Sequence, residues 1–143
     1  MHDKINLSMK KGITFGAFDL FHAGHVLMLQ EAKTVCDYLI VCIQTDPSLD
    51  RKSKNTPIQS LLEREIQITA CRYVDEVMVY ETEADLIEIL DSVEWDVRIL
   101  GDEYQNKDFT GRDKYFDKCY FNKRPHTFSS SELRKRVAEK ESN

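Results

Sequence analysis

The sequence predicts an α/β protein with a doubly wound parallel sheet of about five strands and helices on both faces. Strand-like and helix-like segments alternate along the chain, and only five glycines and three prolines interrupt them. The run 38–43, Tyr-Leu-Ile-Val-Cys-Ile, is almost continuously apolar, as is typical of a strand buried on both faces. Alternation of this kind favours right-handed βαβ units.

The expected elements follow in chain order. Strands have short β-prone or apolar runs, and helices have apolar residues three and four apart. We expect strands at 12–15, 38–43, 76–80, 97–100 and 118–122. We expect helices at 25–36, 57–72, 84–92 and 129–139, the second beginning at Pro57, which suits a first helical turn. A polar loop is expected at 46–55, and residues 1–143 are expected to form one Rossmann-like domain with an ordered core of about 10–140.

Composition excludes several classes of protein. The net charge is −5 and no segment is strongly basic, which argues against nucleic acid as a partner. No apolar run approaches the roughly 20 residues needed to cross a bilayer, and the polar start 1–10 lacks the apolar centre of a signal peptide. The four cysteines form no CxxC pair. We therefore expect a reduced, cytoplasmic protein without membrane insertion.

Polar residues gather where the expected strands end. In parallel α/β sheets ligands bind beyond the carboxyl ends of the strands. That rule selects residues 16–25, 45–54, 101–105 and 123–130. No GxGxxG sequence follows the first strand, so a dinucleotide-binding dehydrogenase is disfavoured.

The stretch 16–25, Gly-Ala-Phe-Asp-Leu-Phe-His-Ala-Gly-His, carries the strongest chemical signal. His22 and His25 are three apart at a helix entry, so their side chains share a face. Gly24 leaves room for a phosphate to approach the backbone, where free N–H groups attract anions. Two imidazoles with these N–H groups would stabilise a pentacoordinate phosphorus. The alternatives are two surface histidines, or a zinc site, which is weaker because no third ligand stands nearby.

This stretch resembles the G-x-F-D-x-x-H-x-G-H signature of the cytidylyltransferases, within the wider H-x-G-H nucleotidyltransferase superfamily. The chain is most similar to bacterial glycerol-3-phosphate cytidylyltransferases, over roughly 11–137, including Arg-Tyr-Val-Asp-Glu-Val at 72–77 and Leu-Gly-Asp-Glu at 100–103. The resemblance implies that His22 and His25 hold the triphosphate of CTP and stabilise the transition state. It also implies a homodimer and a CDP-linked product for a surface polymer such as teichoic acid or capsule. The surrounding nucleotide site would comprise Phe15, Gly16, Ala17, Phe18, Asp19 and Gly24.

Further charged residues are assigned through the same resemblance. Lys52 and Lys54 would contact phosphates, Lys52 also binding the acceptor, although both could be ordinary solvated loop charges. Arg64 would take part in acceptor binding, unless it is a surface ion-pair partner. Asp102 would lie in the nucleotide pocket, where a carboxylate can accept a hydrogen bond from the amino group of cytosine or adenine. A simple turn at the strand end is the alternative for Asp102.

The segment before the last helix combines a structural and a functional signal. Ser129 and Glu132 fit the S-x-x-E capping box, and a hydroxyl-rich helix start is also a phosphate site. The resemblance implies that Arg124, Thr127, Ser129 and Ser130 bind the β and γ phosphates. Pro125 and His126 depart from the family pattern, so the acceptor is the least determined feature.

These residues predict in-line displacement at the α phosphorus of CTP by an acceptor phosphate, with Mg²⁺ neutralising the triphosphate. Asp19 could orient a histidine, help hold Mg²⁺ or simply form a turn. Glycerol 3-phosphate is the expected acceptor. The alternatives are phosphocholine, phosphoethanolamine or another polyol phosphate, an adenylyltransferase using ATP, and a non-catalytic nucleotide-binding module. All of these except the last require the histidine pair and the serine cluster to meet in space.

Overall fold

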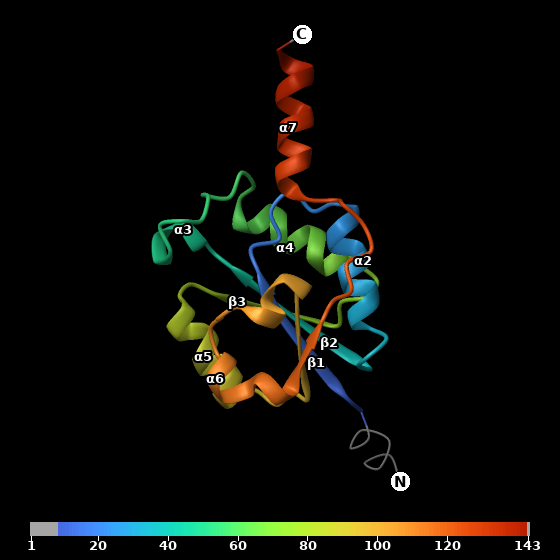
Figure 1. The fold of residues 1–143 in the computed structure, drawn as a ribbon, viewed down its shortest axis with the longest axis vertical. Coiled ribbons are helices and arrows are strands. Elements are labelled where there is room, and N and C mark those ends of the chain that lie inside the picture. The colour runs from blue at the N-terminus through green and yellow to red at the C-terminus, as the bar shows by residue number, and fades with distance from the viewer. Residues whose placement is uncertain (1–8, 143) are drawn as a thin grey trace.

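The computed structural model, which describes residues 9–142, contains a parallel sheet in the order β3-β2-β1-β4-β5 (Figure 1). The strands are β1 (Lys11–Gly16), β2 (Tyr38–Gln44), β3 (Glu76–Tyr80), β4 (Val97–Leu100) and β5 (Cys119–Phe121). The strand order reverses at β1, which lies between β2 and β4. This confirms the predicted fold class, and the reversal is the point at which such sheets bind ligands.

Helices cover both faces of the sheet. The first helical layer packs α2 (Ala23–Ala32) and α4 (Leu61–Ala70) on one face, and α5 (Glu83–Ser92) packs on the other. Shorter elements connect the strands, and the chain ends in a helix that projects from the body (Figure 1). These are α3 (Pro47–Asp50), η1 (Asp102–Asn106), α6 (Arg112–Tyr115), η2 (Phe116–Lys118) and α7 (Ser130–Glu141).

Two apolar cores follow from the alternation of side chains along the strands. In β2, Leu39, Val41 and Ile43 point toward α2 and α4, whereas Ile40 and Cys42 point toward α5. Successive side chains of a strand face opposite sides, so a strand buried on both faces needs apolar residues at nearly every position. The continuous apolar run in the sequence has this physical origin.

Several element boundaries differ from the sequence prediction. The helix expected from Pro57 begins at Leu61, because Ser60 and Glu63 form a reciprocal capping box just before it. It ends at Ala70 rather than residue 72, and α2 spans Ala23–Ala32 rather than 25–36. The loop predicted at 46–55 contains α3, capped by Asp46. The short helices between 102 and 118 were not predicted.

All four cysteines are free, in agreement with the absence of a predicted disulfide framework. Within residues 9–142, no helix is both long and apolar enough to cross a membrane. No signal peptide was expected in the polar start 1–10, and residues 1–8 of that stretch lie outside the described part of the chain.

Candidate active site

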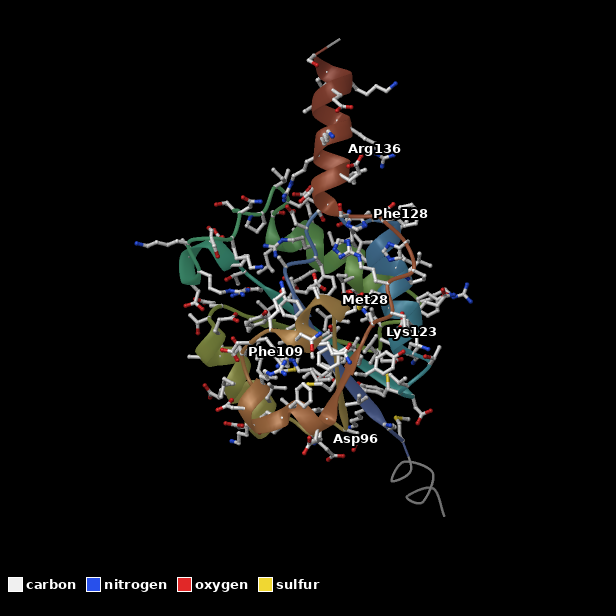
Figure 2. The ribbon with its side chains drawn as sticks, in the orientation of Figure 1. Met28, Asp96, Phe109, Lys123, Phe128 and Arg136 are labelled. Atoms are coloured by element: carbon white, nitrogen blue, oxygen red, sulfur yellow. The ribbon has the colours of Figure 1, made fainter. Side chains whose placement is uncertain are left out.

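A cleft of about 940 Å³ lies at the carboxyl ends of the strands, where the sheet order reverses. Its two parts are built by different elements. The α2-side lobe contains His22, Gly24, His25, Arg124, Phe128, Ser129 and Ser130. The α5-side lobe contains Phe15, Tyr80, Glu83, Arg98, Phe109 and Thr110. Figure 2 labels one residue of each lobe, Phe128 beside the start of α7 and Phe109 lower in the view.

The two histidines cap the helix on which they stand. His22 is the N-cap of α2, and its Nδ1 accepts a hydrogen bond from Gly24 N at 3.0 Å. Reciprocally, Nδ1 of His25 accepts from the backbone N–H of His22 at 3.1 Å. Because both Nδ1 atoms accept, both neutral rings carry their proton on Nε2. The two imidazoles lie 3.9 Å apart between ring centroids, so two Nε2–H donors stand side by side.

The start of α7 meets this pair, as the sequence predicted. His22 Nε2 lies 3.1 Å from the Ser130 hydroxyl oxygen, 108 positions away in the chain. The loop before α7 also crosses Gly24 closely: a Cβ at that position would lie 3.0 Å from the Phe128 carbonyl oxygen. A side chain at position 24 would therefore push the two segments apart, which explains the glycine of the motif.

Burial keeps the imidazoles neutral. Desolvation, followed by the charge of His22, lowers the pKa of His25 from 6.5 to about 3, against an opposing effect of Asp19. Desolvation, His126 and Arg124 also lower the pKa of His22. At neutral pH both rings are uncharged hydrogen-bond donors, and the positive charge in the α2-side lobe comes from Arg124.

Asp19 anchors the loop instead of facing the cleft. Its carboxylate accepts from the backbone N–H groups of Ile58 and Gln59 at 2.8 and 2.9 Å, and from Arg134 of α7 at 3.0 Å. Desolvation opposes ionisation of this buried carboxyl, but these donors outweigh it and lower its pKa. Asp19 does not line the cleft. These donors engage both carboxylate oxygens, and contact of Asp19 with the nucleotide or Mg²⁺ stays a prediction.

The backbone on both sides of Asp19 is strained. Phe18 and Leu20 both have positive φ angles, 53° and 51°, a region that non-glycine residues rarely occupy. Leu20 N donates to the side chain of Gln59, which fixes the same loop from outside. Such strain persists only where surrounding contacts over-determine the conformation.

Arg64 is likewise held by backbone groups. It is only 2% exposed, and its guanidinium donates to four backbone carbonyl oxygens. These carbonyls belong to Ala17 of the β1–α2 loop, Gln44 and Thr45 at the end of β2, and Gln59 before α4. Arg64 therefore joins three segments beneath the cleft, and its part in acceptor binding stays a prediction.

The remaining predicted residues divide into those that line the cleft and those that do not. Phe15, Gly16, Ala17, Phe18 and Lys54 line it, together with the predicted members of the α2-side lobe. The exposed residues Lys52, Asp102 and Thr127 do not line it, and their ligand contacts stay predictions. Two adjacent residues do line it: Arg51, and Glu103, whose carboxylate lies 3.9 Å from Arg124.

Sequence reasoning missed the polar residues of the α5-side lobe and left His126 without a role. His126 lines the cleft, and its Nδ1 accepts from Phe128 N at 3.1 Å, the same local pattern that His22 makes with Gly24. Arg98 could have been noticed, because it interrupts the apolar strand Val-Arg-Ile-Leu. Thr110 and Glu83 carried no comparable signal.

A family model described as cytidylyltransferase-like matches residues 13–136. The chain belongs to this family. The cytidylyltransferase-like chain is 40% identical to the glycerol-3-phosphate cytidylyltransferase of Bacillus subtilis over 100 residues, which cover 69% of this chain and 76% of the relative. It is 45% identical to the ethanolamine-phosphate cytidylyltransferase of Arabidopsis thaliana over 80 residues, or 53% of this chain. That match covers 19% of the Arabidopsis protein, and the match to the Dictyostelium discoideum ethanolamine-phosphate enzyme covers 25%.

Solved structures share the fold. A lipopolysaccharide core biosynthesis protein from Thermoplasma volcanium aligns with a TM-score of 0.59 and 23% identity, over 92% of this chain and 88% of that one. A bifunctional NMN adenylyltransferase/ADP ribose pyrophosphatase from Francisella tularensis aligns with a TM-score of 0.60 and 14% identity, over 92% of this chain and 42% of that one. At these identities the likeness concerns the fold alone.

The lowered pKa of His25 predicts a pH-dependent stability for the cytidylyltransferase-like chain. Between pH 6.5 and about 3 the unfolded chain binds a proton at His25 that the folded chain does not. The free energy of unfolding therefore falls as the pH falls through this window, with a limiting slope of about 1.4 kcal/mol per pH unit. Urea unfolding of wild type and His25→Asn at pH 7, 6, 5 and 4.5 measures it. Parallel pH profiles for the two proteins would contradict the assignment.

Replacement of Arg64 tests its structural position. Arg64→Met leaves up to four buried carbonyls without a donor, so we expect a loss of about 3 kcal/mol or more in the free energy of unfolding. The matched control is Arg72→Met, which removes an exposed arginine from the residues just after α4 and should change stability by less than about 0.5 kcal/mol. If Arg64 instead bound the acceptor, Arg64→Met would be as stable as the control and would raise only the acceptor KM.

Proposed function

We propose that this chain transfers CMP from CTP to a small phosphorylated acceptor, glycerol 3-phosphate, giving a CDP-linked product and pyrophosphate. The observation that carries the proposal is the meeting of the neutral histidine pair at the start of α2 with the start of α7, where His22 Nε2 lies 3.1 Å from the Ser130 hydroxyl oxygen. Donors fixed in advance around one point stabilise charge that develops on phosphoryl oxygens. Membership of the cytidylyltransferase-like family supports CTP as the nucleotide.

The proposed reaction is an in-line displacement. An acceptor phosphate oxygen forms a bond to the α phosphorus, and the bond from that phosphorus to the oxygen bridging the α and β phosphates breaks. The bonding electrons leave with pyrophosphate. The acceptor phosphate is already anionic, so the reaction needs no general base, and positioning with charge stabilisation supplies the catalysis. His22 and His25 would donate to the α phosphate, and Arg124, Ser129 and Ser130 to the leaving phosphates.

Mg²⁺ is proposed only as the companion of CTP. Among residues 9–142 no group of three or more His, Cys, Asp or Glu side chains could hold a metal ion, and Asp19 is already occupied by hydrogen bonds. Mg²⁺ commonly binds nucleotide phosphates and keeps several of its waters, so it does not need a protein cage. The ion would therefore enter with the triphosphate.

The acceptor and nucleotide are tested by a screen of pyrophosphate release. Relatives are named for glycerol 3-phosphate and for ethanolamine phosphate, so both acceptors, and phosphocholine, belong in the screen with CTP, ATP, UTP and GTP. Turnover with ATP would favour an adenylyltransferase. Binding of CTP without pyrophosphate release in the presence of any acceptor would favour a non-catalytic module.

The proposed product would be made in the cytoplasm for a surface polymer.

His22→Asn separates catalysis from folding. Asparagine is a good N-cap, and its side-chain oxygen can replace Nδ1 as the acceptor for Gly24 N, but it lacks the Nε2–H donor. We expect kcat to fall about 10²- to 10³-fold, with stability within about 1 kcal/mol of wild type.

The control for this variant is Thr82→Asn, which exchanges the N-cap of α5, away from the histidines, for the same residue. It should retain wild-type turnover. Pyrophosphate release and urea unfolding measure both variants, and near-normal turnover in His22→Asn would remove this imidazole from the mechanism.

We also propose that the enzyme is a homodimer. Leu62 and Ile66 are exposed one turn apart on α4, and Val137 is 57% exposed on the projecting helix α7. Exposed apolar patches are typical of protein–protein interfaces. Sedimentation velocity should give twice the chain mass for wild type and a shift toward the monomer for Ile66→Lys. A monomeric wild type would contradict the proposal.

A further inference from the structure

The α5-side lobe contains a charged group that the proposed reaction does not use. Arg98 lies within β4 and is 4% exposed. Its guanidinium lies over two rings, 5.1 Å from the centroid of Phe15 and 5.3 Å from that of Phe109. A cation inside a buried strand is unfavourable unless a partner compensates for its lost hydration.

The hydrogen bonds of Arg98 are incomplete. Nη1 donates to the Thr110 carbonyl oxygen at 2.5 Å, and Nε is buried without a partner among the described residues. No carboxylate of residues 9–142 forms an ion pair with Arg98. Buried donors are nearly always satisfied, so a guanidinium that lines a cleft with N–H groups to spare is suited to an oxygen atom of a ligand.

A carboxylate stands across Thr110 from this guanidinium. The Thr110 carbonyl accepts from Arg98, and its hydroxyl donates to Glu83 Oε1 at 2.8 Å. Glu83 Oε2 is only weakly engaged, at 3.4 Å from Gln44 Nε2, and Arg51 lies 3.9 Å from Oε1. Arg98 and Glu83 both line the cleft, so this lobe offers a ligand one donor and one acceptor.

Among the groups that distinguish the candidate acceptors, only a hydroxyl satisfies both partners. A hydroxyl can accept from Arg98 and donate to Glu83 at the same time. An ammonium group can only donate, and the guanidinium would repel it. A carboxylate can only accept, and Glu83 would repel it. The pair is thus complementary to hydroxyl groups.

The rings of the lobe lead to the same conclusion. Aromatic faces bind quaternary ammonium groups and other ligand cations. Here the faces of Phe15 and Phe109 are already covered by a cation of the chain itself. Arg98 therefore occupies a position on these rings that the trimethylammonium of phosphocholine or the ammonium of phosphoethanolamine would otherwise take.

The lobe lies on the acceptor side of the proposed reaction. Arg98 lies over Phe15 on the face of the sheet that α5 covers, and Tyr80, which ends β3, and Glu83, which begins α5, belong to the same face. The leaving phosphates are assigned to the loop between β5 and α7, in the α2-side lobe. In-line displacement places the attacking and leaving oxygens on opposite sides of the phosphorus, so the acceptor would approach from the α5 side.

We infer that Arg98, with Glu83, is a specificity-determining residue that selects a polyol phosphate and rejects phosphorylated amino alcohols. The inference rests on the proposed transfer of CMP to a phosphorylated acceptor. Arg98 would bind the tail of the acceptor, away from the phosphate that attacks.

Arg98→Met tests the inference, because methionine keeps much of the side-chain volume and a buried charge can often be replaced by an apolar residue without loss of stability. We expect the KM for glycerol 3-phosphate to rise about tenfold or more while the KM for CTP stays the same. The ratio of kcat/KM for glycerol 3-phosphate to that for phosphoethanolamine should fall about 10- to 100-fold, as expected when a buried group that recognises hydroxyls is lost.

The matched control is Arg112→Met. Arg112 also lies over Phe109, at 5.5 Å, and over Phe116, at 4.4 Å, but it does not line the cleft. Its replacement removes an arginine that packs on the same ring as Arg98. It should leave both KM values and the acceptor ratio unchanged. An equal change in both variants would assign the effect to loop packing and overturn the inference.

A measurement on the wild-type protein decides the question even if Arg98→Met fails to fold. Propyl phosphate has the phosphate of glycerol 3-phosphate but neither hydroxyl group, so its kcat/KM should be at least about 10²-fold lower. Equal use of the two acceptors, or an unchanged ratio in a folded Arg98→Met, would overturn the inference and leave the transfer of CMP intact. Preference of the wild type for phosphoethanolamine would do the same. Absence of pyrophosphate release with every acceptor would overturn both proposals.

Discussion

The reciprocal capping of α2 by its own two histidines is the interaction on which the site depends. An aspartate at the N-cap would satisfy the helix equally well, but it would have no donor for a ligand. An imidazole has two nitrogens, so Nδ1 can accept from the helix start while Nε2–H faces the opposite way. The helix start thereby sets the tautomer, the orientation and the neutral state of both rings, and α7 brings Ser130 to the same point.

Two buried charged residues, Asp19 and Arg64, hold this arrangement without lining the cleft. Asp19 ties the β1–α2 loop to the residues before α4 and to α7, and Arg64 ties the same loop to the end of β2. Each uses charge-assisted hydrogen bonds to backbone groups, which are stronger than those between neutral groups. They compensate for the strained backbone at Phe18 and Leu20. Position matters here because a misplacement of about 1 Å in a phosphoryl-transfer site can cost two orders of magnitude in rate.

Local patterns in the sequence were sufficient for the strands and for the meeting of the histidine motif with the serine cluster. A buried strand, a His-x-x-His spacing and a capping serine are each determined within a few residues. Sequence patterns could not give the surroundings of side chains whose partners come from distant segments. Arg64 and Asp19 match the family motif, yet their partners lie in loops that sequence patterns do not place. Asp102 and Glu103 are adjacent, and only the course of η1 decides that Glu103 reaches the cleft.

The separate origins of the two lobes explain how one fold can serve different acceptors. The α2-side lobe is built by the β1–α2 loop and the start of α7, whose contacts with each other leave little room for change. The α5-side lobe is built by β3, β4, α5 and the loop at 109–110, and within residues 9–142 its residues form no hydrogen bond with the side chains assigned to the phosphates. Under the proposed reaction, the second lobe can therefore change with the acceptor while the first stays the same. In this chain the cation that an amino alcohol would bring is already present as Arg98, which makes the strand itself part of the selection of substrate.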